Sequence, residues 1–93
     1  MREKEVEQKL VKTVRKAGGF CIKFTSPGFD GVPDRLVLLQ KGRIAFIDLK
    51  ASGKKPRALQ IRRMKQLSNL GFACYVIDNT DEIGGVIDEI QSS

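Results

Sequence analysis

The chain has 93 residues, of which 41% are hydrophobic, and its 17 Lys and Arg against 11 Asp and Glu give a net charge of +6 and a pI of about 9.6. This length allows one small core, so we expect a single domain over residues 1–93, and the composition argues against disorder. No apolar run approaches the roughly 18 residues of a transmembrane helix, and the charged N-terminus leads into no signal core. We therefore expect a cytoplasmic protein with a polyanionic partner and no membrane partner.

Histidine is absent and cysteine occurs twice, at Cys21 and Cys74, which limits the chemistry open to the chain. A zinc site built from the usual ligands is nearly excluded, and mechanisms based on Ser-His-Asp or Cys-His are excluded. Both cysteines lie in apolar, strand-like runs, where a reduced thiol serves as a small hydrophobic side chain. An enzyme of this composition must use carboxylates, lysines and an oxygen-preferring metal, and we expect no small-molecule organic cofactor.

The N-terminal third predicts a helix followed by a short strand. Between residues 3 and 17, apolar side chains recur every three or four positions, which indicates an amphipathic helix that ends before two glycines. Alternation over residues 20–24 then predicts a first strand. Glu3 and Glu7 lie at the edge of the apolar face, where a solvated acid paired with a lysine is the alternative to a functional role. The residues expected on the buried face are Val6, Leu10, Val14 and Ala17.

The run Ile-Ala-Phe-Ile-Asp-Leu-Lys at residues 44–50 predicts a central strand, because apolar residues fill both of its faces. Asp48 and Lys50 share one face at its end, and charges there are costly unless something uses them. A surface ion pair is the alternative explanation. Pro33-Asp34 brings a second carboxylate to the start of the preceding strand, 36–39, and the short turn between the two strands predicts an antiparallel hairpin.

The last third predicts a helix, a strand and a final helix. Pro56 suits the first turn of a helix that ends at Leu70, and the strand at 72–77 follows closely enough to indicate a parallel crossover. The final helix, near 80–91, begins after the capping residues 78–80. The expected buried side chains are Leu59, Met64 or the stem of Arg63, Leu67 and Leu70 in the first of these helices, and Ile83, Val86, Ile87 and Ile90 in the second.

Basic residues concentrate in the loop 51–57, directly after Lys50, and continue onto the next helix. This distribution fits a nucleic-acid backbone, and a solvated basic loop is the alternative. The loop 25–33 also offers backbone amides and hydroxyls suited to a phosphate, although loops of this composition usually only turn the chain. The candidate DNA-binding residues are Lys23, Ser26, Lys54, Lys55, Arg57, Arg62 and Arg63.

Three acids and one lysine are therefore expected at one end of the sheet, namely Asp34, Asp48, Lys50 and either Glu7 or Glu3. Oxygen ligands on rigid elements suit Mg²⁺ or Mn²⁺. A lysine beside such a metal can orient or deprotonate an attacking water, or hold a phosphate as a point charge. Hydrolysis of a phosphodiester needs little besides these groups and a surface that binds the nucleic acid.

Gly31-Val32-Pro33-Asp34 followed by Asp48-Leu49-Lys50 resembles the PD-(D/E)xK nuclease superfamily, and more narrowly the VRR-NUC domain in its short, stand-alone form from bacteriophages and bacteria. The other matching segments are Glu3–Glu7, Leu10–Lys12, Gly18-Gly19, Lys23-Phe24, Ser26–Gly28, Gly42-Arg43, Lys54–Pro56, Leu59-Gln60, Leu70–Phe72 and Tyr75-Val76. The resemblance implies an α/β fold with a restriction-endonuclease-like α-β-β-β-α-β core, a mixed four-stranded sheet and a C-terminal helix. It also implies DNA cleavage that depends on Mg²⁺ or Mn²⁺.

The resemblance assigns roles residue by residue. The implied metal ligands are Asp34, Asp48, Glu7 and the main-chain carbonyl of Leu49, and the implied catalytic residues are Asp34, Asp48, Lys50, Glu7 and Gln60. Glu7 fits the family pattern better than Glu3, and Gln60 is expected to contact Lys50, water or DNA. Position 48 is Asp where the family more commonly has Glu, which shortens the reach to a metal by one methylene. Asp30 is interpreted as a turn residue.

The resemblance further implies a homodimer that cuts branched DNA such as four-way junctions, in the cytoplasm of a bacterial host if the chain is of phage origin. Either the apolar face of the last helix or the residues around the glycine-rich loop would form the dimer interface. A basic DNA-binding module with an inactive or partner-dependent nuclease core is the alternative, and metal binding distinguishes the two. RNA is less favoured as a substrate, because five Phe and one Tyr provide no evident platform for stacking bases.

Overall fold

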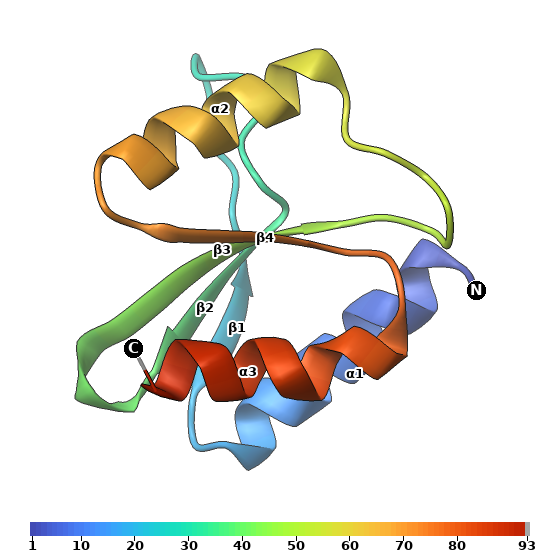
Figure 1. Ribbon diagram of the computed structural model, residues 1–93, viewed down its shortest axis with the longest axis vertical. Helices are drawn as coiled ribbons and strands as arrows, with labels where there is room; N and C mark the ends of the chain where they lie inside the picture. Colours follow the sequence, from blue (N-terminus) through green and yellow to red (C-terminus); the bar gives the residue numbers. More distant parts are fainter. Residues whose placement is uncertain (93) are drawn as a thin grey trace.

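The computed structural model describes residues 1–92 and contains a mixed four-stranded sheet between helices (Figure 1). The elements are α1 (Glu3–Lys16), β1 (Phe20–Lys23), β2 (Arg35–Leu39), η1 (Gln40–Gly42), β3 (Arg43–Leu49), α2 (Ala58–Asn69), β4 (Ala73–Ile77), η2 (Thr80–Glu82) and α3 (Ile83–Ser92). The strand order is β1-β2-β3-β4, with β3 antiparallel to β2 and parallel to β4. The predicted α-β-β-β-α-β core with a C-terminal helix is therefore confirmed.

The two faces of the sheet are covered differently. α1 and α3 lie together on one face, and α2 lies on the other (Figure 1). The predicted apolar faces of α1 and α3 meet the sheet here, and Ala17 and Val86 pack at the margin, partly buried. Among residues 1–92, no helix has the length and apolarity needed to cross a bilayer. The buried core consists of Val6, Leu10, Val14, Val37, Leu39, Ala45, Ile47, Leu49, Ile77, Ile83, Ile87 and Ile90.

β3 is the central strand that its sequence predicts, since it pairs with β2 on one side and β4 on the other. Residues 45–49 are all buried, with alternate side chains directed to the two faces. On the α2 side, the ring of Phe46 lies 5.5 Å from that of Phe24 and 5.6 Å from that of Phe72, measured between centroids. Asp48 follows Phe46 on the same face and is fully buried. A carboxylate thus enters an otherwise apolar layer.

The predicted buried face of α2 is partly wrong. Leu59 is 38% exposed and Leu70 is 74% exposed, whereas Gln60 is the buried residue of this helix. Met64 and Leu67 are half-buried, as expected for residues that turn toward the sheet with Gln60. The physical reason is that α2 meets the sheet mainly along β4, so only a narrow strip of the helix is covered.

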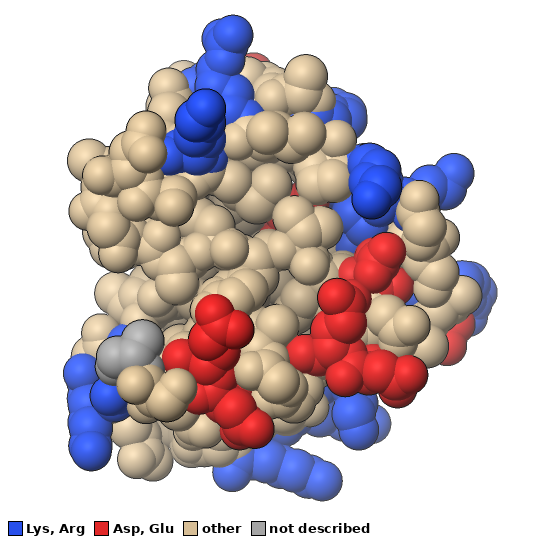
Figure 2. All heavy atoms as spheres, in the orientation of Figure 1, with Lys and Arg blue, Asp and Glu red and all other residues tan. Residues whose placement is uncertain are grey.

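Charge is distributed unevenly along the chain and over the surface. No Lys or Arg follows Lys65, whereas five acids do, all between residues 78 and 89. Acidic side chains gather on the lower half of the face shown in Figure 2, where Figure 1 places η2 and α3. The positive charge therefore belongs to the part of the molecule formed by α1, α2 and the loops between the strands.

We predict that Gly19→Ala destabilises the protein by about 1–3 kcal/mol, because the added methyl group collides with backbone that cannot rotate away. A Cβ at Gly19 would collide with the carbonyl oxygen of Leu38, the residue of β2 that lies opposite Phe20 at the start of β1. Gly84→Ala on α3 is the matched control, since its Cβ would have no heavy atom within 4 Å. Alanine is preferred in a helix, so this control should stabilise by up to about 1 kcal/mol. Urea unfolding measures both, and equal effects of the two substitutions would contradict the packing described.

Candidate active site

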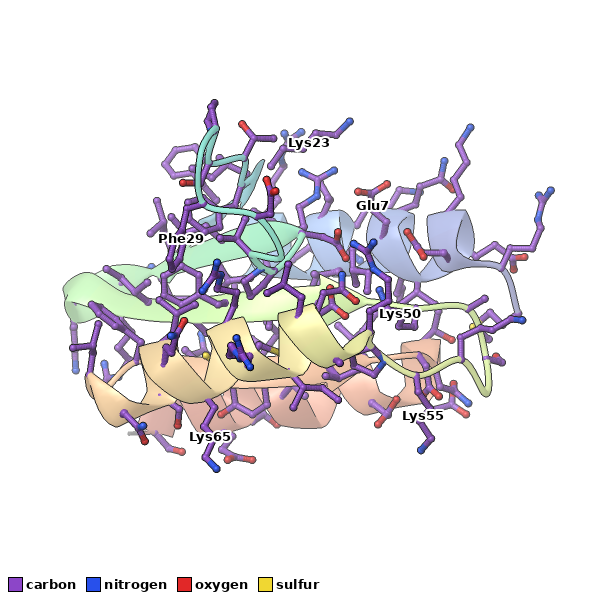
Figure 3. The ribbon with its side chains drawn as sticks, turned by 90° about the horizontal axis from the view of Figure 1, so that it is seen from above. Glu7, Lys23, Phe29, Lys50, Lys55 and Lys65 are labelled. Carbon is purple, nitrogen blue, oxygen red and sulfur yellow. The ribbon has the colours of Figure 1, made fainter. Side chains whose placement is uncertain are left out.

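Two carboxylates and one lysine meet at the carboxyl end of β3. Asp48 is near the end of this strand, and Lys50 directly follows it. Asp34 immediately precedes β2, and because β2 runs antiparallel to β3, with Arg35 opposite Ile47, the start of β2 lies beside the end of β3. Figure 3 shows Lys50 between α2 and α1 when the molecule is viewed from above. The hairpin thus brings together groups that lie well apart in the sequence.

Asp48 is the least accessible charged group of this cluster. Its Oδ1 accepts a hydrogen bond of 3.2 Å from Nε2 of Gln60, and its Oδ2 lies 3.1 Å from Nζ of Lys50. The Lys50 contact is at ion-pair distance but does not have the geometry of a hydrogen bond, so within residues 1–92 Oδ2 is a buried acceptor without one. The Lys50 ammonium therefore compensates this oxygen by charge alone, and a hydrogen-bond donor or a bound metal ion would complete its surroundings.

Asp34 is held rigidly against the end of β3. Its Oδ2 accepts a hydrogen bond of 2.8 Å from the backbone N–H of Leu49. Its own carbonyl oxygen accepts from the backbone N–H of Phe24 at 3.0 Å, which extends the pairing of β1 with β2. Both the side chain and the main chain of Asp34 are therefore positioned by the sheet.

The surroundings of Asp48 disfavour its charged form. Burial raises the pKa of this carboxyl from an ordinary 3.8 to about 6, and the neighbouring Asp34 carboxyl acts in the same direction. Lys50 opposes the shift without cancelling it. Two neighbouring carboxyl groups that raise the pKa in this way form an arrangement that a bound cation would stabilise.

Gln60 connects α2 to the carboxylate pair. Its Oε1 accepts a hydrogen bond of 2.9 Å from the backbone N–H of Arg57, at the start of α2, while its Nε2 donates to Asp48. We expected Gln60 to contact Lys50, water or DNA, and the contact that the structure shows is with Asp48. The side chain therefore orients the carboxylate from the helix that covers it.

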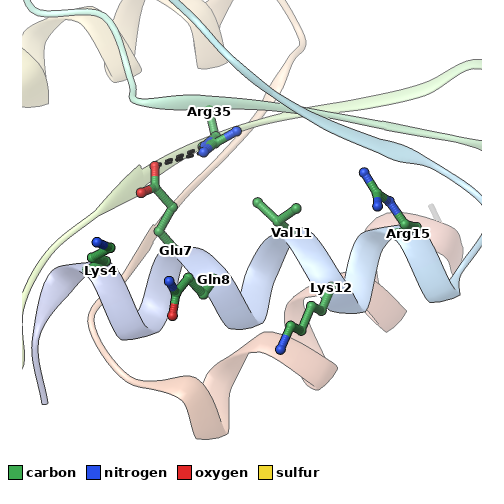
Figure 4. A pocket seen from close by; sticks show the side chains of 7 residues that line it. All are labelled: Lys4, Glu7, Gln8, Val11, Lys12, Arg15 and Arg35. Atoms are coloured by element: carbon green, nitrogen blue, oxygen red, sulfur yellow. Dashed lines mark hydrogen bonds and ion pairs between the residues drawn. The ribbon is translucent and has the colours of Figure 1, made fainter.

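Glu7 lies outside the carboxylate pair because it is bound to Arg35. Its Oε2 accepts from Nε of Arg35 at 3.1 Å and from Nη2 at 2.9 Å, while Nη1 donates to the carbonyl oxygen of Cys21 at 3.1 Å (Figure 4). Glu7 and Glu3 nevertheless both line a cavity of about 240 Å³ that Asp34 also lines. The sequence analysis did not predict that Arg35 would bind Glu7. The only indication in the sequence was the position of this arginine, directly after the motif residue Asp34.

The predicted set of three acidic side chains around one metal is not formed. Among residues 1–92, no group of three or more Asp, Glu, His or Cys side chains is close enough together to hold a metal ion. The physical reason is the Arg35 guanidinium, which binds the Glu7 carboxylate to β2. Two carboxylates, Asp34 and Asp48, remain as the side-chain ligands that a cation could share.

The residues predicted to contact DNA occupy different positions around this site. Lys23 is exposed and lines the same cavity as Asp34, and Ser26 is half-buried in the loop 24–34, where its carbonyl oxygen accepts from the backbone N–H of Phe29 at 3.0 Å. The residues that are exposed on the loop after β3 and on α2 are Lys54, Lys55, Arg57 and Arg62.

Arg63 differs from the other predicted DNA contacts, because its guanidinium holds the loop 24–34 against α2. Nε donates to the carbonyl oxygen of Asp30 at 2.7 Å, and the guanidinium carbon lies 4.0 Å from the centroid of the Phe29 ring. Nη1 also donates to Gln66 at 3.0 Å. Arg63 thus fixes the loop that leads into Asp34, and Asp30 contributes to that loop through its backbone.

A phage protein and a solved structure resemble the chain over most of its length. The protein named "Putative nuclease p44" from Acyrthosiphon pisum secondary endosymbiont phage 1 is 48% identical over 81 residues, which are 87% of each chain. A solved structure described as a VRR_NUC domain matches with a TM-score of 0.86 and 26% identity, covering 92% of this chain and 94% of that one. The chain belongs to the VRR-NUC family. No protein-family model matches this VRR-NUC chain. The family resemblance predicted from the two short motifs is confirmed, as is its phage type.

We predict that Asp48→Asn raises the free energy of unfolding of this VRR-NUC chain by about 1–3 kcal/mol above pH 6, when no divalent metal is present. The folded protein holds the Asp48 proton more tightly than the unfolded chain does. The stabilising contribution of that proton is therefore full below about pH 4 and is lost as the pH rises toward about 6. Asparagine has no such proton, and its oxygen can still accept from Gln60.

Urea unfolding between pH 4 and 8 in the presence of a chelator measures this effect. Asp30→Asn is the control, since it removes an acid that is exposed in the loop 24–34. A pH profile of Asp48→Asn that parallels the wild-type profile would show that the buried carboxyl is not the source of the pH dependence.

Proposed function

We propose that this VRR-NUC chain is a DNA endonuclease of the PD-(D/E)xK type, that it depends on Mg²⁺ or Mn²⁺, and that residues 1–93 form one nuclease domain. The observation that carries the proposal is the buried Oδ2 of Asp48, which lies 3.1 Å from Nζ of Lys50 and beside Asp34. The nuclease name of the phage relative supports the same activity.

The residues present fit a divalent metal. Mg²⁺ and Mn²⁺ prefer oxygen ligands, and Mg²⁺ in particular keeps several waters and needs only one or two carboxylates beside the phosphate of a substrate. Asp34 and Asp48 supply those carboxylates, and the main-chain carbonyl of Leu49 is a further candidate ligand. When bound, the metal lowers the pKa of a coordinated water and neutralises charge on the phosphoryl oxygens.

The other site residues act around that centre in the proposed reaction, in which water adds to phosphorus and one phosphoester bond breaks. Lys50 holds the phosphate or orients the attacking water, because its ammonium already lies at the carboxylate that faces the reacting group. Gln60 keeps Asp48 in position through its hydrogen bond. The helix acid of the proposed site is Glu7, which Arg35 holds at the wall of the cavity that Asp34 also lines, or Glu3 on the same wall.

Exposed basic residues on two sides of the site are proposed to bind the DNA backbone. Lys54, Lys55 and Arg57 lie on the loop that follows Lys50. This loop is anchored where the backbone N–H of Gly53 donates to Asp78 at 3.3 Å. Arg62 continues this surface along α2. Lys23 lies on another side, where it lines the cavity next to Asp34, and Ser26 follows it in the loop 24–34. Contacts of this kind position the backbone without reading sequence.

We propose further that the protein is a homodimer that prefers branched DNA, since symmetric cutting of two strands requires two active sites. The apolar face of α3 cannot form the interface, because Ile83, Ile87 and Ile90 are buried in the core. An exposed apolar strip crosses the uncovered part of the sheet instead. Phe20 is 69% exposed, and the strand register places it beside Leu38, which lies beside Ile44.

This strip fits a second copy of the chain. Ile22, which is 45% exposed, extends it along β1, and side chains directly opposite on paired strands share one face. Monomeric proteins rarely expose continuous apolar surface of more than a few hundred Å². The free edge of β1 is a poorer interface, because Arg35 already donates to the Cys21 carbonyl oxygen there. A face-to-face contact around a two-fold axis remains the arrangement that covers the strip.

We predict that the wild-type protein cleaves a four-way junction in Mg²⁺ or Mn²⁺ and that Lys50→Ala reduces the rate by about 100-fold or more. Lys65→Ala removes an exposed lysine elsewhere on α2 and should retain the wild-type rate. A gel assay on junction, flap, single-stranded and duplex DNA measures both the activity and the preferred structure. Equal cleavage by Lys50→Ala and the wild type would sink the assignment.

A DNA-binding module with an inactive core is the second candidate, and the basic loop is the observation that favours it. Metal binding separates the two, because an ion that binds only the folded state raises the unfolding midpoint. Mn²⁺ should raise the midpoint of the wild type and have little effect on Asp34→Asn. No shift in the wild type, together with intact DNA affinity and no cleavage, would establish the module instead.

We predict that light scattering after size exclusion gives twice the monomer mass of 10.4 kDa for the wild type. Phe20→Asp places a charge in the exposed strip and should yield monomers, because burying an unpaired carboxylate in an interface is unfavourable. Ile61→Asp, at another exposed apolar position on α2, should remain dimeric. A monomeric wild type at micromolar concentration would refute the dimer.

A further inference from the structure

A cavity of about 460 Å³ runs along the outer side of α1, beside the face that packs into the core (Figure 4). One wall consists of Lys4, Lys12 and Arg15, which the 3.6-residue period of the helix places on one strip. Arg35 of β2 and Glu7 also line it. Gln8 and Val11 complete the lining, and we call this cavity the α1 groove. None of its three helix cations has a place in the site described above.

The charges of the α1 groove are only partly compensated. Arg35 uses all three guanidinium nitrogens, on Glu7 and on the Cys21 carbonyl oxygen, so this pair is a fixed and neutral part of the wall. Lys4, Lys12 and Arg15 are exposed, and within residues 1–92 none of them forms an ion pair. Three uncompensated cations along one strip create a site for a polyanion and not for a neutral ligand.

The groove begins where the candidate active site ends. Glu7 lines both the α1 groove and the smaller cavity that Asp34 lines. From Lys4 to Arg15 the helix rises about 16 Å, which corresponds to about five nucleotides of a duplex strand. The acidic residues of η2 and α3 gather on the face shown in Figure 2, and none of them is among the residues that line the α1 groove.

We propose that the α1 groove binds the phosphodiester backbone of the DNA that flanks the cleaved bond. The proposal that DNA binds here is argued from the charges of the groove alone. Only the position of the cleaved bond relative to the groove rests on the proposed function. DNA would then contact the protein on both sides of the carboxylate pair, through the basic loop and α2 on one side and through α1 on the other. Each phosphate contact adds to the affinity and to its dependence on salt.

The test compares two double charge reversals on the same helix. Lys12→Glu with Arg15→Glu changes the groove, whereas Lys9→Glu with Lys16→Glu makes the same change in net charge at exposed positions outside it. Fluorescence anisotropy with a labelled duplex in a chelator measures affinity as a function of salt. We expect the groove variant to bind at least about tenfold more weakly at 0.1 M salt, with a salt slope smaller by about two. The control should stay within about threefold of the wild type.

Shortening the duplex identifies which part of the DNA the groove holds. Removing about five base pairs from the flank on the α1 side should weaken binding by the wild type and leave the groove variant nearly unaffected. Lys12→Gln with Arg15→Gln, which removes the charges without reversing them, should show a similar slope change with a smaller loss of affinity, and guards against misfolding of the first variant.

Two outcomes separate this inference from the proposed function. If the groove variant and its control lose DNA affinity equally, the groove is not a DNA-binding surface, even if the wild type cleaves DNA as proposed. Conversely, a wild type that does not cleave would overturn the nuclease proposal, while a difference between the two double variants would still establish the groove as a backbone-binding surface.

Discussion

The hydrogen bond from the Leu49 N–H to Asp34 is the contact on which the arrangement of the site depends. It joins the start of β2 to the end of β3, and it exists because the hairpin register places Arg35 opposite Ile47. A shift of one residue would send Asp34 and Asp48 to opposite faces of the sheet, since side chains alternate along a strand. The same register directs Ala45, Ile47 and Leu49 into the core, so packing and site geometry are determined together.

Burial of Asp48 is the principal electrostatic cost of this arrangement. A carboxylate that replaces an apolar side chain on the central strand loses its hydration, and its raised pKa expresses that loss. Gln60 and Lys50 recover part of it, one through a hydrogen bond and the other through charge. The remainder is left at Oδ2, which has no hydrogen bond in the described residues. Destabilisation of this kind at one atom is typical of sites that bind or react with something.

The surfaces around the site have distinct physical characters. The loop after Lys50 and the exposed side of α2 are basic, α1 carries a second cationic strip, and the region of η2 and α3 is acidic (Figure 2). On the α2 side of the sheet, β1 and β2 expose apolar side chains that α2 does not reach. Polyanion binding and self-association thus draw on separate surfaces. Neither disturbs the core between α1, α3 and the sheet, because the apolar strip lies on the opposite face of the sheet and the cations of α1 lie on the exposed side of that helix.

The sequence by itself determined the order of the elements, the central position of β3 and the meeting of Asp34 with Asp48 and Lys50. These follow from strand alternation and a short turn, which act over a few residues. The motifs at residues 31–34 and 48–50, with the other matching segments, also indicated the family. Only the tertiary structure decided that Glu7 binds Arg35, 28 residues away, and that Arg63 binds the backbone of Asp30, 33 residues away. The tertiary structure also decided which side of α2 packs against the sheet. Periodicity describes one helix at a time, whereas these contacts depend on which partners the folded chain brings within reach.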